Sequence, residues 1–247
     1  MAESLDKSGR KDKVAQLLDS LPDEIGNTIY TSQLRSAYIK PKIWPNKSIV
    51  WYAASDLEPW SPKSLKTGIG GSEEAIIYLS KEMAKLGYSV TVYANVGKDE
   101  GTYDGVEYLN FQRFNHRDKF DILIGWRNPQ LFRHNIFDAR LILLDLHDVP
   151  VPEEFTENVL NQADYIMVKS KYHRSLLPKV PDGKFIIIPN GIDSDQLSKV
   201  KGKHKRYKVF YGSSYDRGLH GLLKIWPEVK KAEPLAELHI CYAWILS

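Results

Sequence analysis

The chain has 247 residues, of which 43% are hydrophobic, a formal net charge of +3 and a single cysteine, Cys241. This length suffices for one sizeable domain with a hydrophobic core, or for one domain and part of a second. A lone cysteine excludes an internal disulfide, and no apolar run approaches the ~20 residues that a membrane span needs. The charged amino terminus is unlike a signal peptide, so we expect a cytoplasmic protein, with a peripheral place at a membrane left open. Cys241 lies in an apolar stretch and is expected to be buried.

Residues 1–46 are expected to form an extension ahead of the main domain. Apolar residues at helical spacing predict a short amphipathic helix over residues 11–21, through Val14, Leu17, Leu18 and Leu21. Pro41 and Pro45 then interrupt regular structure before the first predicted strand. The sequence indicates no role for residues 1–46.

A glycine-rich helix start follows the apolar strand predicted at residues 49–54. Gly70 and Gly71 precede Ser72, a good N-cap, and apolar residues then recur at helical spacing. Glycines can adopt positive φ, and the free N–H groups of a helix start attract anions, so this stretch is a candidate phosphate site. The alternative is a simple tight turn. A dinucleotide-binding loop fits poorly because Glu73 stands where a third glycine is needed, which disfavours a nicotinamide or flavin enzyme.

Predicted strands and helices alternate from residue 48 onward, which is typical of an α/β fold. Further strands are predicted at residues 88–94, 106–111, 121–126, 140–146, 165–169 and 185–188. Helices are predicted near residues 129–134, 153–161 and 172–177. Several strands are apolar at consecutive positions, which indicates a parallel sheet covered by helices on both faces.

The composition changes after residue 193. Residues 194–207 are rich in lysine and are expected to form a solvated linker, since a basic run of this kind is a weak indication of nucleic-acid binding. A strand, a helix and a strand are then predicted at residues 208–211, 217–231 and 237–242. One such unit of about forty residues cannot bury its own sheet faces, so we expect residues 208–247 to be the start of a second domain that is cut short.

Three side chains that could bind an anion or a hydroxyl follow predicted strands. Arg127 follows residues 121–126, His147 follows residues 140–146, and Arg217 stands at a helix start in the second region. Ligands of open α/β sheets bind beyond the carboxyl ends of the strands, which makes these residues candidates. The alternatives are a histidine satisfied by local backbone and arginines that are surface charges. The sequence shows no metal-ligand spacing, no Gly-x-Ser-x-Gly elbow and no Walker loop, which disfavours hydrolases and kinases.

Four stretches, taken in order, resemble the retaining glycosyltransferases of the GT-B fold, specifically the family-four (group 1) type. They correspond to a glycine loop, an active-site histidine segment, a hinge and the opening of a nucleotide-binding domain, at residues 70–73, 146–148, 188–193 and 211–227. The resemblance implies a complete Rossmann-like domain with a parallel sheet on the acceptor side, over residues 47–193. It also implies that residues 208–247 are the first βαβ unit of a second Rossmann-like domain, which binds the nucleotide sugar.

The activity implied by the resemblance is transfer of a hexose from a nucleotide-diphosphate sugar to a glycan or lipid-linked acceptor, with retention of configuration. His147 and Arg217 would be catalytic, and the donor phosphates would contact Gly70, Gly71, Ser213 and Arg217. Acceptor or hinge roles would fall to Glu73, Arg127, Asn190, Gly191 and Asp193. No metal or other cofactor is implied, because cationic side chains and backbone dipoles would neutralise the charge that develops on the leaving group.

The chain also departs from the family pattern. Ser213 stands where relatives often have an arginine, and Tyr242-Ala243-Trp244 replaces Tyr-Gly-Trp shortly before the last residue. The family's later donor-binding segment is absent, so we expect a truncated or split enzyme whose activity alone is undecided. The alternatives are completion by a second polypeptide, a non-catalytic acceptor-binding module and an inactive remnant.

Overall fold

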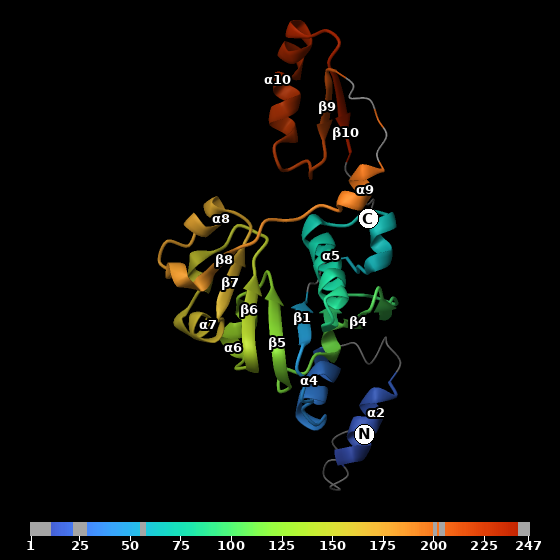
Figure 1. Cartoon of the computed structure of the whole chain (residues 1–247), viewed down its shortest axis with the longest axis vertical. Helices are drawn as coiled ribbons and strands as arrows, with labels where there is room; N and C mark the ends of the chain where they lie inside the picture. The colour runs from blue at the N-terminus through green and yellow to red at the C-terminus, as the bar shows by residue number, and fades with distance from the viewer. Residues whose placement is uncertain (1–10, 22–28, 55–57, 200–201, 203–205, 242–247) are drawn as a thin grey trace. The chain divides into compact units, whose positions relative to one another are not determined.

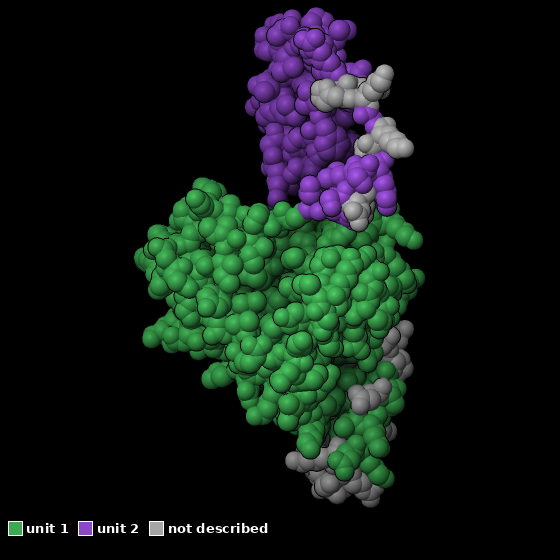
Figure 2. All heavy atoms as spheres, in the orientation of Figure 1, with its two compact units in different colours: residues 1–191 green, residues 192–247 purple. Residues whose placement is uncertain are grey.

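The computed structural model describes residues 11–21, 29–54, 58–199, 202 and 206–241. The chain divides into two compact units, Met1–Gly191 and Ile192–Ser247 (Figure 2). Both units are α/β, and each has its own sheet. Within the described ranges, no helix is both long enough and apolar enough to cross a membrane.

The first unit is built on an eight-stranded sheet with the strand order β3-β4-β2-β1-β5-β6-β7-β8 (Figure 1). Its strands are β1 Ser48–Ala53, β2 Ser89–Ala94, β3 Gly101–Tyr103, β4 Val106–Asn110, β5 Lys119–Trp126, β6 Asp138–Asp145, β7 Tyr165–Val168 and β8 Phe185–Ile187. All neighbouring pairs are parallel except β3 and β4. The chain runs from β1 outward to β2 and β4, then returns to β5 on the other side of β1. The switch point of this Rossmann-like sheet therefore lies between β1 and β5.

Helices cover both faces of this sheet. The segments are α2 Lys11–Asp19, α4 Ile29–Tyr38, η1 Pro62–Lys66, α5 Gly71–Lys85, η2 Phe111–Arg113, α6 Gln130–His134, η3 Pro152–Glu154, α7 Glu157–Gln162, α8 Lys171–Ser175 and η4 Asp182–Lys184. Helix α5 contributes Ile76 and Ile77 to one hydrophobic cluster. Helices α6 and α7 contribute Phe132 and Val159 to another.

Strand β1 shows why the sheet is buried on both sides. Ile49 and Trp51 belong to the cluster under α5, whereas Val50 belongs to the cluster under α6 and α7. Successive side chains of a strand point to opposite faces, so a continuously apolar strand needs cover on both. The predicted α/β fold with a mostly parallel sheet is confirmed.

Among the strands and α-helices of this unit, β3 and α4 were not predicted. Strand β3 pairs with β4 through a two-residue turn in which Asp104 has φ 49° and Gly105 has φ 83°. Positive φ at both central residues is the requirement of a type I′ hairpin, and Asp-Gly is one of its preferred sequences, so the signal was present. Helix α4 lies within the predicted extension and contacts α2.

The end of the predicted extension is attached to the sheet. Trp44 is buried and its indole Nε1 donates to Asp118 Oδ2 at 3.0 Å, while the Lys42 backbone N–H donates to Asp118 Oδ1 at 2.9 Å. The Trp44 backbone N–H also donates to the carbonyl of Lys119, the first residue of β5, at 2.9 Å. Burial raises the pKa of Asp118, although the hydrogen bonds from Lys42 and Trp44 oppose this effect.

The second unit contains α9 Ser194–Ser198, β9 Lys208–Tyr211, α10 Leu219–Ala232 and β10 Glu237–Ile240. Strands β9 and β10 form a parallel two-stranded sheet, which confirms the predicted strand-helix-strand unit. In the described part of this unit, Ala236 is the one buried apolar residue. Cys241 is exposed, so the expectation that it is buried is wrong, because so small a sheet covers little of its own surface. The predicted end of the last strand, residue 242, lies outside the described residues.

Candidate functional site

The candidate site lies at the carboxyl ends of β5, β6 and β7 and at the amino terminus of α5, all in the first unit. Arg127 follows β5 directly, and His147 follows β6 by two residues. Glu73, in the first turn of α5, contacts Arg127. Because parallel strands end at the same edge, three segments far apart in the sequence meet beside the switch point.

The amino terminus of α5 differs from the prediction. Gly70 is the N-cap with φ −63° and ψ 143°, so it does not use the positive φ that a glycine can adopt; the positive φ, 105°, occurs at Gly68. Ser72 is already inside the helix and donates to Glu73 Oε2 at 2.8 Å, so it is not the cap. A Cβ at Gly70 would lie 2.2 Å from Glu73 Oε2 and would displace this carboxylate, whereas a Cβ at Gly71 would meet nothing within 4 Å.

The carboxylate of Glu73 therefore folds back over the start of its own helix. Glu73 is 8% exposed and its Oε1 accepts from Arg127 Nη1 at 3.3 Å. A carboxylate at this position is stabilised by the positive end of the helix dipole. A phosphate that approached Gly70 and Gly71 would meet this carboxylate first.

Arg127 joins the three segments of the site. Its backbone has φ 64°, an unusual left-handed conformation, and its N–H donates to the carbonyl of Asp145 at 2.8 Å. Its guanidinium pairs with Glu73 and, through Nε, with Asp148 after β6, and it packs over the Trp126 ring at 4.8 Å. Arg127 is thus held between two carboxylates and is not a free anion clamp.

His147 is packed into the same edge of the sheet. Its side chain is 4% exposed, and its Nε2 lies 3.1 Å from Asp145 Oδ2. The Lys169 ammonium, directly after β7, donates to Asp145 Oδ1 at 2.5 Å. The Trp126 ring lies 6.2 Å from the imidazole, centroid to centroid. Asp145 and Lys169 were missed in the sequence analysis, although each is a charged residue at the end of an apolar strand, the same signal that identified His147.

A second histidine lies behind this group. The Nδ1 of His173, in α8, accepts from the backbone N–H of Lys169 at 3.2 Å. An accepting Nδ1 carries no proton, which makes His173 a neutral imidazole. Burial lowers the pKa of His173; the nearby backbone of Asp148 opposes this effect, and the positive charge of Lys169 reinforces it.

The net charge of the site does not favour the binding of an anion. Glu73, Asp145 and Asp148 face Arg127 and Lys169, three carboxylates against two cations, when His147 is neutral. Closely paired carboxylates, cations and an imidazole offer many donors and acceptors to a ligand with several hydroxyl groups. In the described part of the chain, no group of three or more His, Cys, Asp or Glu residues could hold a metal ion.

The other predicted residues lie elsewhere. Ser213 and Arg217 belong to the second unit, where the Arg217 backbone N–H donates to the carbonyl of Ser214 at 3.0 Å. Asn190, Gly191 and Asp193 lie in the segment without regular structure that joins β8 to α9. The site described above is therefore a feature of the first unit alone.

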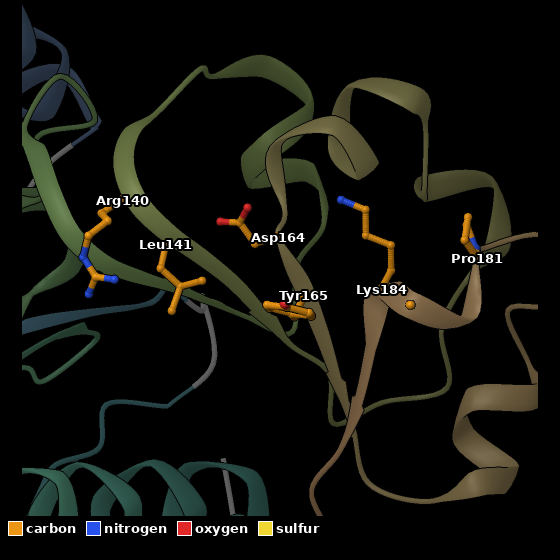
Figure 3. A pocket seen from close by; sticks show the side chains of 7 residues that line it. Arg140, Leu141, Asp164, Tyr165, Pro181 and Lys184 are labelled. Atoms are coloured by element: carbon orange, nitrogen blue, oxygen red, sulfur yellow. The ribbon is translucent and has the colours of Figure 1, made fainter.

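A hollow of about 520 Å³ lies at the opposite edge of the sheet (Figure 3), lined by Arg140, Leu141, Asp164, Tyr165, Pro181, Gly183 and Lys184. Its charged groups are already engaged. Lys184 Nζ donates to the Ala163 carbonyl at 2.8 Å, and Asp164 accepts from the Ile142 backbone at 2.8 Å. This edge holds the amino-terminal ends of the strands, whereas ligands of such sheets bind at the carboxyl ends. The hollow is therefore not our candidate site.

Known protein families give no further guide to the site. No family model matches the chain, and no curated protein matches its sequence. A functional assignment therefore depends on the side chains that meet at the carboxyl edge of the sheet, which are Glu73, Arg127, Asp145, His147 and Asp148.

Proposed function

We propose that the chain is a retaining hexosyltransferase of the GT-B type, which moves a hexose from a nucleotide-diphosphate sugar to a glycan or lipid-linked acceptor. The observation that carries the proposal is the position of His147, which lies at the carboxyl end of β6 with Asp145 behind it and the Arg127 ion pairs beside it. The order of the four motif stretches along the chain supports the same assignment.

In this proposal the first unit binds the hexose and the acceptor. His147 and the carboxylates of Glu73 and Asp148 form hydrogen bonds with hydroxyl groups. Because Glu73 already occupies the start of α5, the backbone at Gly70 and Gly71 is better suited to the hexose than to the phosphates. Asn190, Gly191 and Asp193 serve as the hinge segment.

The second unit binds the diphosphate. As the bond between the anomeric carbon and the phosphate oxygen breaks, negative charge grows on the leaving diphosphate, and Arg217 and backbone N–H groups near Ser213 stabilise it. The acceptor oxygen forms its bond on the face that the phosphate leaves, which retains the configuration. The acceptor's hydroxyl proton passes to the departing phosphate, so no metal is required in this scheme.

The proposal is tested by the release of nucleotide from GDP-, UDP- and ADP-hexoses, with the whole chain and a panel of glycan and lipid-linked acceptors. His147→Ala should lower turnover about 100-fold, the usual loss when one hydrogen bond to the reacting group is removed. His134→Ala, an exposed histidine in α6, is the matched control and should leave turnover unchanged. Absence of turnover with every donor, or equal losses in both variants, would overturn the proposal.

Arg217 has a test of its own. Arg217→Ala should weaken the binding of nucleoside diphosphates more than that of nucleosides, measured by calorimetric titration, because the partner of the guanidinium is phosphate. Equal losses for both kinds of ligand would remove Arg217 from the phosphate site.

A second candidate is a carbohydrate-binding module that holds the acceptor and does not catalyse. The balance of three carboxylates against two cations in the first unit favours it, since such a site suits hydroxyl groups better than phosphates. Binding to a glycan array without turnover of any nucleotide sugar is the result that would select this function.

A further inference from the structure

Asp145 is a buried carboxylate whose neighbours on the adjacent strands are apolar. It is 0% exposed, and its neighbours in register are Trp126 of β5 and Met167 of β7. A buried carboxylate loses its hydration, which is costly unless both oxygens find partners. Both do: Oδ1 accepts from Lys169 Nζ at 2.5 Å, and Oδ2 lies 3.1 Å from His147 Nε2.

The backbone directs these three side chains to one place. His147 lies two residues beyond Asp145, and Lys169 two residues beyond Met167, the register partner of Asp145. Residues two apart along extended chain point to the same face. Trp126 and Met167 belong to the cluster under α5, so Asp145, His147 and Lys169 meet at the end of that face.

The hydrogen bond to Asp145 selects one form of His147. A carboxylate can only accept, so Nε2 must carry the proton, and the neutral imidazole then has its lone pair on Nδ1. Lys169 already balances the charge of Asp145, so this carboxylate does not need a positive charge on His147.

The other charged groups nearby have partners of their own. Arg127 is paired with Glu73 and Asp148, and Asp148 meets it through the guanidinium Nε. His173 is neutral, because its Nδ1 accepts from the Lys169 backbone. Lys169 is therefore the cation that balances Asp145.

We propose that Lys169 is a positioning residue: through Asp145 it holds His147 as the neutral Nε2–H tautomer, so that Nδ1 accepts a hydrogen bond from a hexose hydroxyl. His147 then recognises a hydroxyl rather than a phosphate, since a neutral imidazole that donates inward has only an acceptor left for the ligand. The identification of the ligand as a hexose rests on the proposed function, whereas the tautomer of His147 and its dependence on Lys169 do not.

The test is nitrogen NMR of the imidazole rings in the uniformly ¹⁵N-labelled whole chain. Long-range proton–nitrogen spectra distinguish the two neutral tautomers and the charged ring, and His147→Gln assigns the His147 signals. The expected result for the unmodified protein at pH 7.5 is a neutral ring with the proton on Nε2. A ring with its proton on Nδ1, or a charged ring, would overturn the proposal without any further variant.

Two substitutions should move the titration of His147 in opposite directions. In Lys169→Met the unbalanced Asp145 should raise the midpoint by about one pH unit or more, and in Asp145→Asn the unbalanced Lys169 should lower it. Lys169→Arg should keep the unmodified behaviour. Lys171→Met, two residues away on an exposed position, is the matched control. A midpoint in Lys169→Met equal to that in Lys171→Met would overturn the proposal, and Asp145→Asn decides the matter should Lys169→Met not fold.

The ligand is tested separately with methyl gluco-, galacto- and mannopyranosides and with inorganic pyrophosphate. One of the hexosides should shift the His147 Nδ1 signal, and pyrophosphate should leave it unchanged. A response to pyrophosphate alone would overturn the assignment of a hydroxyl partner. A chain that shows the expected tautomer but transfers no hexose would refute the proposed function and leave the role of Lys169 standing.

Discussion

The two units use the same local elements and reach very different degrees of burial. Both contain parallel strands linked through helices, yet the first unit has a hydrophobic cluster on each face of its sheet. In the described part of the second unit only Ala236 is a buried apolar residue, and Leu223 and Ile225 of α10 are 47% and 57% exposed. The difference teaches that a strand-helix-strand unit forms readily but becomes a core only when further strands and helices cover both faces.

A difference in local stability should follow. Segments with few buried contacts open at low free energy, whereas core strands open only with the whole fold. Amide exchange should therefore be fast throughout α10 and slow in β1 and β5.

Two leucines make the comparison directly. Leu123 of β5 is 0% exposed and Leu223 of α10 is 47% exposed. Leu123→Ala should lower the free energy of unfolding of the first unit by about 2–5 kcal/mol, because it leaves a cavity in a packed core. Leu223→Ala should cost less than about 1 kcal/mol at an exposed site. Urea unfolding followed by tryptophan fluorescence measures the first, and amide exchange in α10 the second. Similar losses would show that the second unit has a core after all.

Two glycines give the next largest effect. A Cβ on Gly125 of β5 would lie 2.6 Å from the Phe132 ring, whereas a Cβ on Gly221 of α10 would meet nothing within 4 Å. Gly125→Ala should therefore destabilise the first unit by about 1–3 kcal/mol through overpacking. Gly221→Ala should slow amide exchange in α10, since alanine favours a helix over glycine by about 0.5–1 kcal/mol. Tolerance of Gly125→Ala would mean that α6 moves easily.

The buried carboxyl of Asp118, which accepts hydrogen bonds from Lys42 and Trp44, makes the stability of the first unit depend on pH. Burial raises the pKa of this carboxyl, so the folded chain binds the proton more tightly than the unfolded chain. Asp118 therefore favours folding below its ordinary value of about 3.9 and loses that contribution as the pH rises through the raised pKa. Relative to Asp118→Asn, the unmodified chain should become less stable as the pH rises from about 4, and the difference should level off above the raised pKa. Parallel pH profiles from urea titrations would contradict this prediction.

The smallest effect on stability concerns Glu73. Glu73→Gln removes a carboxylate from the start of α5 and should cost about 0.3–1 kcal/mol of folding free energy, since the helix dipole favours a negative charge there. The same change should strengthen the binding of pyrophosphate to the site, because Arg127 loses one of its two carboxylate partners. Glu74→Gln, the next residue along α5, is the matched control for calorimetric titration. Unchanged pyrophosphate affinity in Glu73→Gln would show that the Glu73 carboxylate does not oppose anion binding at the start of α5.

Local pattern was enough to predict most of the fold. Apolar patterns predicted every strand of the first sheet except β3, and the parallel arrangement was predicted from the several strands that are apolar at consecutive positions. The places of Arg127 and His147 at strand ends were also predictable, because parallel strands finish at one edge of their sheet.

The partners within the site were not predictable. Glu73 and Arg127 are 54 residues apart in sequence, and Asp145 and Lys169 are 24 apart. Such pairs depend on the register of neighbouring strands and on how α5 packs against them, which only the assembled core decides.

By itself, then, the sequence determined an α/β chain with titratable groups at the ends of its strands, because apolar runs and their breaks are local properties. Tertiary structure alone decided that Glu73 lies over the start of its own helix, that Arg127 is held between two carboxylates and that Lys169 balances the buried Asp145. The physical reason is that the partner of a charge is chosen by distance in the folded chain, where burial makes an unpaired charge too costly to leave alone.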